Sequence, residues 1–212
     1  QHVTHKTLLF LISRIAISST FNKINRINIC IMTLYLFTLQ PEGFKELDLP
    51  EGQSYADFNC LRWNGDSKLA DWKTPELVWF TNEFSQGNER DGDFLKFRGG
   101  APVITETVKN SLSPLLQHCV EFLPVNIADE TRYILNVIFV LDIIDKSKSK
   151  FKIYSDGTIG PCQHAYLNIP EESKPMFKVE GYLPRIFGDQ SLQQFIHQEQ
   201  LSGCLLREYV NP

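Results

Sequence analysis

The chain has 212 residues, of which 42% are apolar and 22% charged, so it is long enough to bury a sizeable core and has the composition of an ordinary globular protein. These values exclude a disordered or collagen-like chain. All 25 acidic residues but only 17 of the 21 basic residues lie in residues 32–212, which gives this part a net charge of −8 and argues against binding to nucleic-acid phosphates.

Residues 1–31 differ from the rest of the chain. They are rich in Ile, Asn and Ser, contain no acidic residue, and end just before Met32, the first methionine. A secretory signal or an amphipathic targeting helix would fit parts of this composition, but the apolar run at 8–12 is short and cannot span a bilayer. We therefore predict that residues 1–31 are an N-terminal extension outside the native domain, and that residues 32–212 form one domain.

The cysteines give information about the compartment. No two of them have the CxxC spacing, and their odd number argues against a closed disulfide framework. A reducing compartment is therefore expected, and we predict a cytoplasmic protein. The five positions are Cys30, Cys60, Cys119, Cys162 and Cys204.

The first predicted element of the domain is a strand. The apolar and aromatic run at 33–39 ends at a turn that contains Pro41, which is typical of a buried strand followed by a change of direction. Residues 76–80 predict another strand. The polar, turn-rich run at 82–92 predicts an exposed loop.

A helix is predicted after Thr105, which can cap its N-terminus. The apolar residues Val108, Leu112 and Leu115 or Leu116 then recur at helical spacing and would form the buried face. Residues 120–125 predict the strand that follows this helix.

The run at 132–144 is dense in Val, Ile, Phe and Tyr. It predicts the clearest strand of the protein, long enough to lie at the centre of a sheet. A charged turn at 145–150 and a strand at 151–154 follow, and the strand leads into a tight turn around Gly157.

The C-terminal third predicts extended segments at 176–181 and 185–187, and then a helix capped by Asp189. This helix stops near Gly203, where a last strand begins at 204–210. Its apolar face is formed by Leu192, Phe195 and Ile196.

The two predicted helices belong to similar units. A shift of 84 residues places Thr105 on Asp189 and Val120 on Cys204, so that a strand, a capped helix and a second strand recur. The sequence thus indicates a weak internal strand-helix-strand repeat, although two unrelated units of this kind would also look alike. Together the elements predict an α+β fold with a mainly antiparallel or mixed sheet and a few short amphipathic helices.

Reactive groups do not form a recognisable site in the sequence. The close pairs His118 with Cys119 and Cys162 with His164 lack the four spaced ligands of a zinc site, and the sequence contains no GxSxG elbow and no phosphate-binding glycine loop. We predict no catalytic residue, metal or cofactor, and hence a binding protein instead of an enzyme. A Cys162 and His164 dyad remains the alternative if the protein is an enzyme.

Several segments in order carry a family resemblance. Their order and spacing resemble the bacterial immunity-protein family numbered eleven of polymorphic toxin systems, formerly described as a domain of unknown function, and the start at 32–35 fits the family's opening strand. The segments are 102–106, 120–125, 133–137, 141–145, 177–179, 185–187 and 203–205.

The resemblance implies a protein that takes part in competition between bacteria. Members of the family protect the producing cell by forming a stoichiometric complex with the cognate toxin domain, and no catalytic residues come with the family. The expected partner is therefore a toxin protein, without nucleic acid or membrane. A small-ligand or regulatory binding module without a toxin partner is the alternative.

The expected toxin-binding surface combines aromatic anchors with acidic residues, because large rings and charged rims characterise protein interfaces. An acidic surface would also suit a basic toxin. The candidate contact residues are Trp72, Trp79, Glu83, Phe84, Glu89, Asp91 and Asp93.

Overall fold

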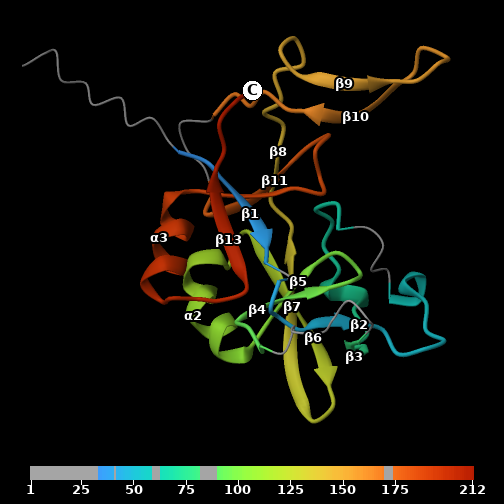
Figure 1. Ribbon diagram of the computed structural model, residues 1–212, viewed down its shortest axis with the longest axis vertical. Coiled ribbons are helices and arrows are strands. Elements are labelled where there is room, and N and C mark those ends of the chain that lie inside the picture. The colour runs from blue at the N-terminus through green and yellow to red at the C-terminus, as the bar shows by residue number, and fades with distance from the viewer. Residues whose placement is uncertain (1–32, 41, 59–62, 82–89, 170–173) are drawn as a thin grey trace, which may run out of the picture. The chain divides into compact units, whose positions relative to one another are not determined.

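The computed structural model of the protein describes residues 33–40, 42–58, 63–81, 90–169 and 174–212 (Figure 1). The chain divides into two units, Gln1–Ile31 and Met32–Pro212, and the description that follows concerns the second unit alone. The prediction about residues 1–31 therefore lies outside the described residues.

The first half of this unit is built around a closed barrel, whose strands follow one another around the wall in the order β2-β3-β6-β7-β5-β4. Alternate residues of these strands point inward and fill the barrel with Leu, Val, Ile and Phe side chains. The strands are β2 (Glu46–Asp48), β3 (Glu76–Phe80), β4 (Phe94–Phe97), β5 (Pro102–Ile104), β6 (Val120–Ile127) and β7 (Glu130–Val137).

The second half contains a five-stranded sheet in the order β13-β1-β12-β11-β8 and a separate hairpin formed by β9 and β10. The first strand of the described chain, β1, thus lies between two strands from the C-terminal third. The bounds are β1 (Tyr35–Leu39), β8 (Val140–Leu141), β9 (Lys150–Ile153), β10 (Ile159–His164), β11 (Met176–Val179), β12 (Ile186–Gly188) and β13 (Cys204–Glu208).

Two α-helices occur in the described residues, α2 (Glu106–Leu116) and α3 (Gln190–Gln198), and both begin at the predicted caps. The Thr105 side chain accepts a hydrogen bond from the Val108 backbone, and Asp189 accepts bonds from the backbones of two residues in the first turn of α3. Short 3-10 turns occur at η1 (Tyr55–Phe58) and η2 (Leu69–Asp71). The mixed sheets and short helices confirm the predicted α+β fold.

The two sheets repeat one another strand for strand. The series β13, β1, β12, β11, β8 corresponds to β6, β7, β5, β4, β2, and in each series three antiparallel pairs are followed by one parallel pair. The registers also agree, since Val120 pairs with Val137 and Cys204, 84 residues later, pairs with Leu39. The structure thus confirms the predicted internal repeat and extends it to the strands around each helix.

Both helices pack into one apolar core, which the two halves share. Val108 and Leu112 of α2 and Leu192 and Ile196 of α3 belong to it, together with inward-facing residues of both sheets. Figure 1 shows α2 and α3 near one another on one side of the sheets, at the left of the view. The two halves therefore bury apolar residues in a common core.

The predicted long strand at 132–144 is wrong in its extent. The chain leaves the barrel at the end of β7, because Ile138 N and Phe139 N both donate hydrogen bonds to the Cys119 carbonyl, at 2.9 and 3.2 Å. It then enters the other sheet as β8, parallel to β11. Continuous apolar character could not distinguish one long strand from two strands in different sheets, since the apolar run at 132–144 includes residues of both strands.

Candidate functional site

A cavity of about 400 Å³ lies where the two halves meet. Its walls come from residues 63–64, the turn at 99–102, residues 135–137 of β7, Lys178 of β11, and the segment that leads into β12. Most of the wall is apolar, and a few polar side chains interrupt it. This combination is typical of small-molecule sites, which are concave and mainly apolar with a few fixed polar groups.

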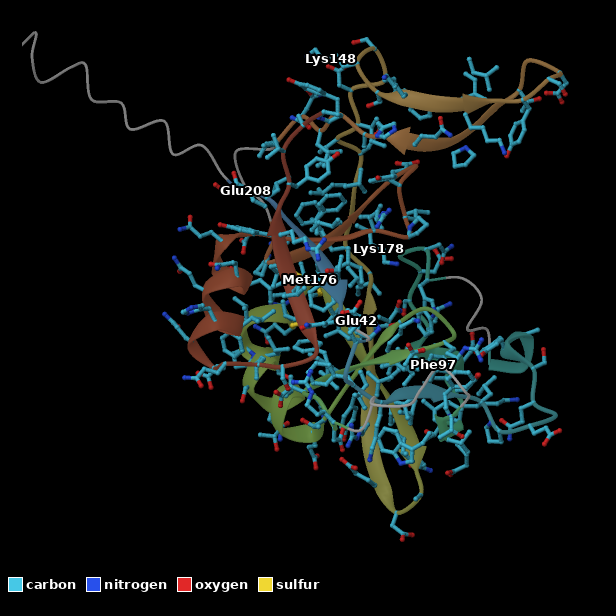
Figure 2. All side chains as sticks on the ribbon, viewed as in Figure 1. Glu42, Phe97, Lys148, Met176, Lys178 and Glu208 are labelled. Atoms are coloured by element: carbon cyan, nitrogen blue, oxygen red, sulfur yellow. The ribbon has the colours of Figure 1, made fainter. Side chains whose placement is uncertain are left out.

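The most unusual wall residue is Lys178, which is only 3% exposed (Figure 2). Its Nζ donates a hydrogen bond to the Trp63 carbonyl, and no carboxylate of the described residues forms an ion pair with it. Burial, and to a lesser extent the positive charge of Lys68, lowers the pKa of Lys178 to about 8. A buried ammonium group without a counter-ion is unfavourable and is uncommon outside functional sites.

Two amide oxygens in the same wall also have no hydrogen-bond partner within the described part of the chain. They are Asn64 Oδ1 and Asn136 Oδ1, both buried. The amide nitrogen of Asn136 donates to the Asp66 carbonyl and to Glu121, each at 3.0 Å, and that of Asn64 donates to the Asp66 carboxylate at 2.6 Å. These bonds orient both amides and leave their oxygens as free acceptors, which is rare for buried polar groups.

Glu121 holds this polar wall in place. Its carboxylate accepts hydrogen bonds from Ser67 Oγ, from the Lys68 backbone at 2.8 Å and from Asn136. Burial alone would raise the pKa of Glu121, but these hydrogen bonds outweigh burial and lower it. Glu121 is therefore a fixed carboxylate that positions the loop carrying Trp63 over the cavity.

A second surface feature is the β9–β10 hairpin. Ile153 and Ile159 face each other across the two strands, and each is 72% exposed. Tyr154 lies beside them, against Gly160, and is 43% exposed. Exposed apolar clusters of this kind mark surfaces that bind other molecules.

The predicted contact residues Trp72 and Trp79 are described and half buried. Both pack against the barrel core, and Trp72 Nε1 donates to the Pro124 carbonyl at 2.8 Å. The ring of Trp79 lies between two cations, with Lys45 Nζ 4.8 Å and the Arg132 guanidinium 5.4 Å from its centroid. The tryptophans therefore contribute to the stability of the barrel wall, and their role in partner binding stays a prediction.

The predicted acidic residues Asp91 and Asp93 make intramolecular bonds. Asp91 accepts two hydrogen bonds from Arg132, at 2.8 and 2.5 Å, and the Arg132 side chain is only 3% exposed. Asp93 accepts bonds from the Ser202 backbone and hydroxyl, at 2.8 and 2.7 Å. The structure thus brings Trp79 and Asp91 together around Arg132, and uses Asp93 to join the two halves.

The other predicted contact residues, Glu83, Phe84 and Glu89, lie outside the described residues. The predicted exposed loop at 82–92 is described only from Arg90 onward.

The cysteines of the described residues are buried free thiols. Burial raises the pKa of Cys119 and Cys162, and raises that of Cys204 to about 12. Cys162 donates a hydrogen bond to the Lys150 carbonyl at 3.6 Å, and a register shift separates it from His164 in the hairpin. A nucleophilic dyad needs a lowered thiol pKa, so this pair has the opposite property. The described residues contain no group of His, Cys, Asp and Glu that could hold a metal ion.

The sequence contains one indication of the cavity. Lys178 and Asn136 are polar residues inside short apolar strands, where such residues are usually replaced by Val or Ile. Their meeting with Asn64 could not be read from the sequence, because the three residues lie on segments far apart in the chain.

No helix within the described residues is both long and apolar enough to span a bilayer. Comparison with protein-family models finds no matching family, and comparison with curated proteins finds no match.

Proposed function

We propose that the protein is a cytoplasmic immunity protein that binds and neutralises a cognate antibacterial toxin domain in a stoichiometric complex. The family resemblance of the segments from 102 to 205 motivates the proposal. The observation that carries it is the β9–β10 hairpin, whose apolar residues Ile153, Tyr154 and Ile159 are exposed in the isolated chain.

The hairpin has the properties of an element that is completed by a partner. A two-stranded hairpin gains little stability by itself in water. Here Cys162 is buried and Phe151 half buried against the rest of the protein, whereas the isoleucine pair lies open to solvent. A toxin face that covers this pair would remove a substantial apolar area from water, which is the main source of affinity in protein complexes.

The charges around the hairpin define the face that it would fit. Lys146, Lys148, Lys150 and Lys152 all belong to the hairpin or to the turn before it, although residues 32–212 are acidic as a whole. The complementary toxin face would therefore present an apolar centre with acidic groups around it. We therefore propose the hairpin as the contact instead of Asp91 and Asp93, because the carboxylates of these two residues are already bonded within the chain.

Co-expression of the full chain with the toxin domain encoded beside its gene tests the proposal. Wild-type protein should restore host survival and co-purify with the toxin. The double variant Ile153→Ser, Ile159→Ser should fold but lose both effects, because it removes the apolar centre of the contact. Leu69→Ser is the matched control, since Leu69 is 60% exposed but lies in η2, away from the hairpin in the chain. Equal rescue by the double variant would exclude the hairpin, and rescue without a complex would favour an enzymatic mechanism.

The cavity at Lys178 favours the alternative function, a small-ligand binding module. Failure of the folded chain to protect the host from the toxin, together with ligand binding at the cavity, would support this alternative.

A further inference from the structure

The repeat of the two sheets reveals an imbalance of charge at Lys178. Its counterpart in the barrel is Lys96, because both residues hold the same register position, Lys96 opposite Pro102 and Lys178 opposite Ile186. On the other side Lys96 pairs with Glu46, and its Nζ lies 3.2 Å from the Glu46 carboxylate.

The corresponding partner of Lys178 is an apolar residue. Lys178 pairs with Val140, which occupies the place of Glu46 in the second sheet. The lysine is thus present in both halves, while the carboxylate that neutralises it is present in one half and is replaced by a methyl-bearing side chain in the other. The half that lacks the carboxylate is the half in which the lysine is buried and lines a cavity.

The other polar groups of the cavity wall are also incomplete. The buried oxygens of Asn64 and Asn136 accept no hydrogen bond within the described residues, and their amide nitrogens are already engaged. The two amide oxygens are fully buried and do not face the open space of the cavity. A buried cation without an anion is costly, and an anion in the cavity that pairs with Lys178 would remove this cost.

The remaining wall defines the body of such a molecule. Trp63, Leu183 and Ile186 line the cavity with apolar and aromatic surface, whereas Leu135 and Val137 are 1% exposed and belong to the shared core. Its volume of about 400 Å³ lies at the lower end of the range for small-molecule sites.

We propose that this cavity binds a small organic carboxylate, whose anionic group pairs with Lys178 and whose apolar body packs on Trp63. This site is separate from the hairpin and does not depend on the proposed immunity function. A bound carboxylate would take the place that Glu46 takes beside Lys96, and it would raise the pKa of Lys178 from about 8 toward the ordinary value of a lysine.

The test uses matched probes on the intact protein. Benzoate, indole-3-acetate and 2-naphthoate, each beside its primary amide, are titrated while the NMR signal of the Lys178 side chain is followed. At least one carboxylate should shift this signal and bind on the order of tenfold more tightly than its amide, because the ion pair is made only with the acid. If no carboxylate shifts the Lys178 signal at millimolar concentration, or if acid and amide bind equally, the proposal is wrong.

Two lysine variants show which lysine causes the preference for acid over amide. Lys178→Met should abolish the preference for acid over amide, whereas Lys96→Met, at the equivalent position of the barrel, should keep it. Unchanged preference in Lys178→Met would contradict the proposal. The titration of the wild-type protein decides the question even if Lys178→Met does not fold.

Discussion

The carbonyl oxygen of Phe94 lies directly against Gly203, so closely that a Cβ atom on residue 203 would be 1.9 Å from it. Gly203 also has a φ of +85°, in the left-handed region that favours glycine. The contact joins β4 of the barrel to the turn before β13, and Phe94 N donates to the Ser202 carbonyl at 3.0 Å beside it. Close backbone approach at this point holds the two halves together.

Gly203→Ala should therefore lower the free energy of unfolding by about 3 kcal/mol, from backbone strain and from the forced separation of the halves. Gly52→Ala is the matched control. Gly52 has a similar φ of +84° but no atom within 4 Å of the position of a Cβ, so only the conformational cost of about 1 kcal/mol remains. Urea denaturation measures both values, and equal losses would contradict the importance of the contact with Phe94.

Asp91 should contribute to stability through Arg132. Asp91→Asn weakens the bidentate pair but leaves Glu130 on the buried guanidinium, so the expected loss at neutral pH is about 1 to 2 kcal/mol. The hydrogen bonds from Arg132 outweigh burial and lower the pKa of Asp91 below 3.8. The contribution is thus complete above the pKa of the unfolded chain and is lost as the pH falls through the lower pKa of the folded protein.

The difference in stability between wild type and Asp91→Asn should accordingly shrink as the pH is lowered below 3.8. Asp129→Asn, on the exposed turn between β6 and β7, serves as the control. A difference that does not change with pH would show that the charge of Asp91 is not what stabilises the fold.

Burial of Lys178 predicts a pH dependence of the same sign as that of Asp91, but at alkaline pH. Its pKa is about 8 in the folded protein and 10.5 in the unfolded chain, so between these values the unfolded chain holds the proton and the folded protein does not. Stability from this group therefore rises with pH across that window.

Comparison with Lys178→Met isolates this effect, because the titrations of Cys204 and Tyr209 are common to both proteins and cancel. The stability of wild type relative to Lys178→Met should increase by about 3 kcal/mol between pH 7 and pH 10.5, measured by denaturation at each pH. A constant difference would mean that the amine has its ordinary pKa.

Val140→Glu would supply the carboxylate that the second sheet lacks. A carboxylate at this position would pair with Lys178 as Glu46 pairs with Lys96. The substitution should therefore raise the pKa of Lys178 and weaken the binding of small carboxylates on the order of tenfold. Val140→Leu is the control for the change in volume. NMR titration of the lysine side chains measures the pKa, and an unchanged pKa would show that the register partner does not control the charge.

The helices and the repeat could be predicted from the sequence because their signals are local. Thr105 and Asp189 cap amphipathic segments, and the distance along the chain from the cap to the following strand is the same in both units. The strand β10 (Ile159–His164) was not predicted, since its residues do not alternate between apolar and polar and include Pro161. This strand forms because it pairs with β9, and not because its residues favour an extended conformation.

The cavity could not be predicted for a different reason. Lys178 donates to the carbonyl of Trp63, 115 residues earlier, and neither residue has a local signal for this contact. The acidic composition around Asp91 and Asp93 indicated a binding surface, but composition does not show whether a carboxylate already has a partner within the chain. Arg132 of β7 provides such a partner for Asp91, because the fold brings the loop at 90–93 against this strand.

Calorimetric titration of the purified toxin domain into the full chain measures directly whether the chain binds a toxin, as we propose. We expect a one-to-one complex, with affinity reduced on the order of a hundredfold by the double variant Ile153→Ser, Ile159→Ser and unchanged by Leu69→Ser. If a folded wild-type chain does not bind the toxin domain, the proposed function is wrong.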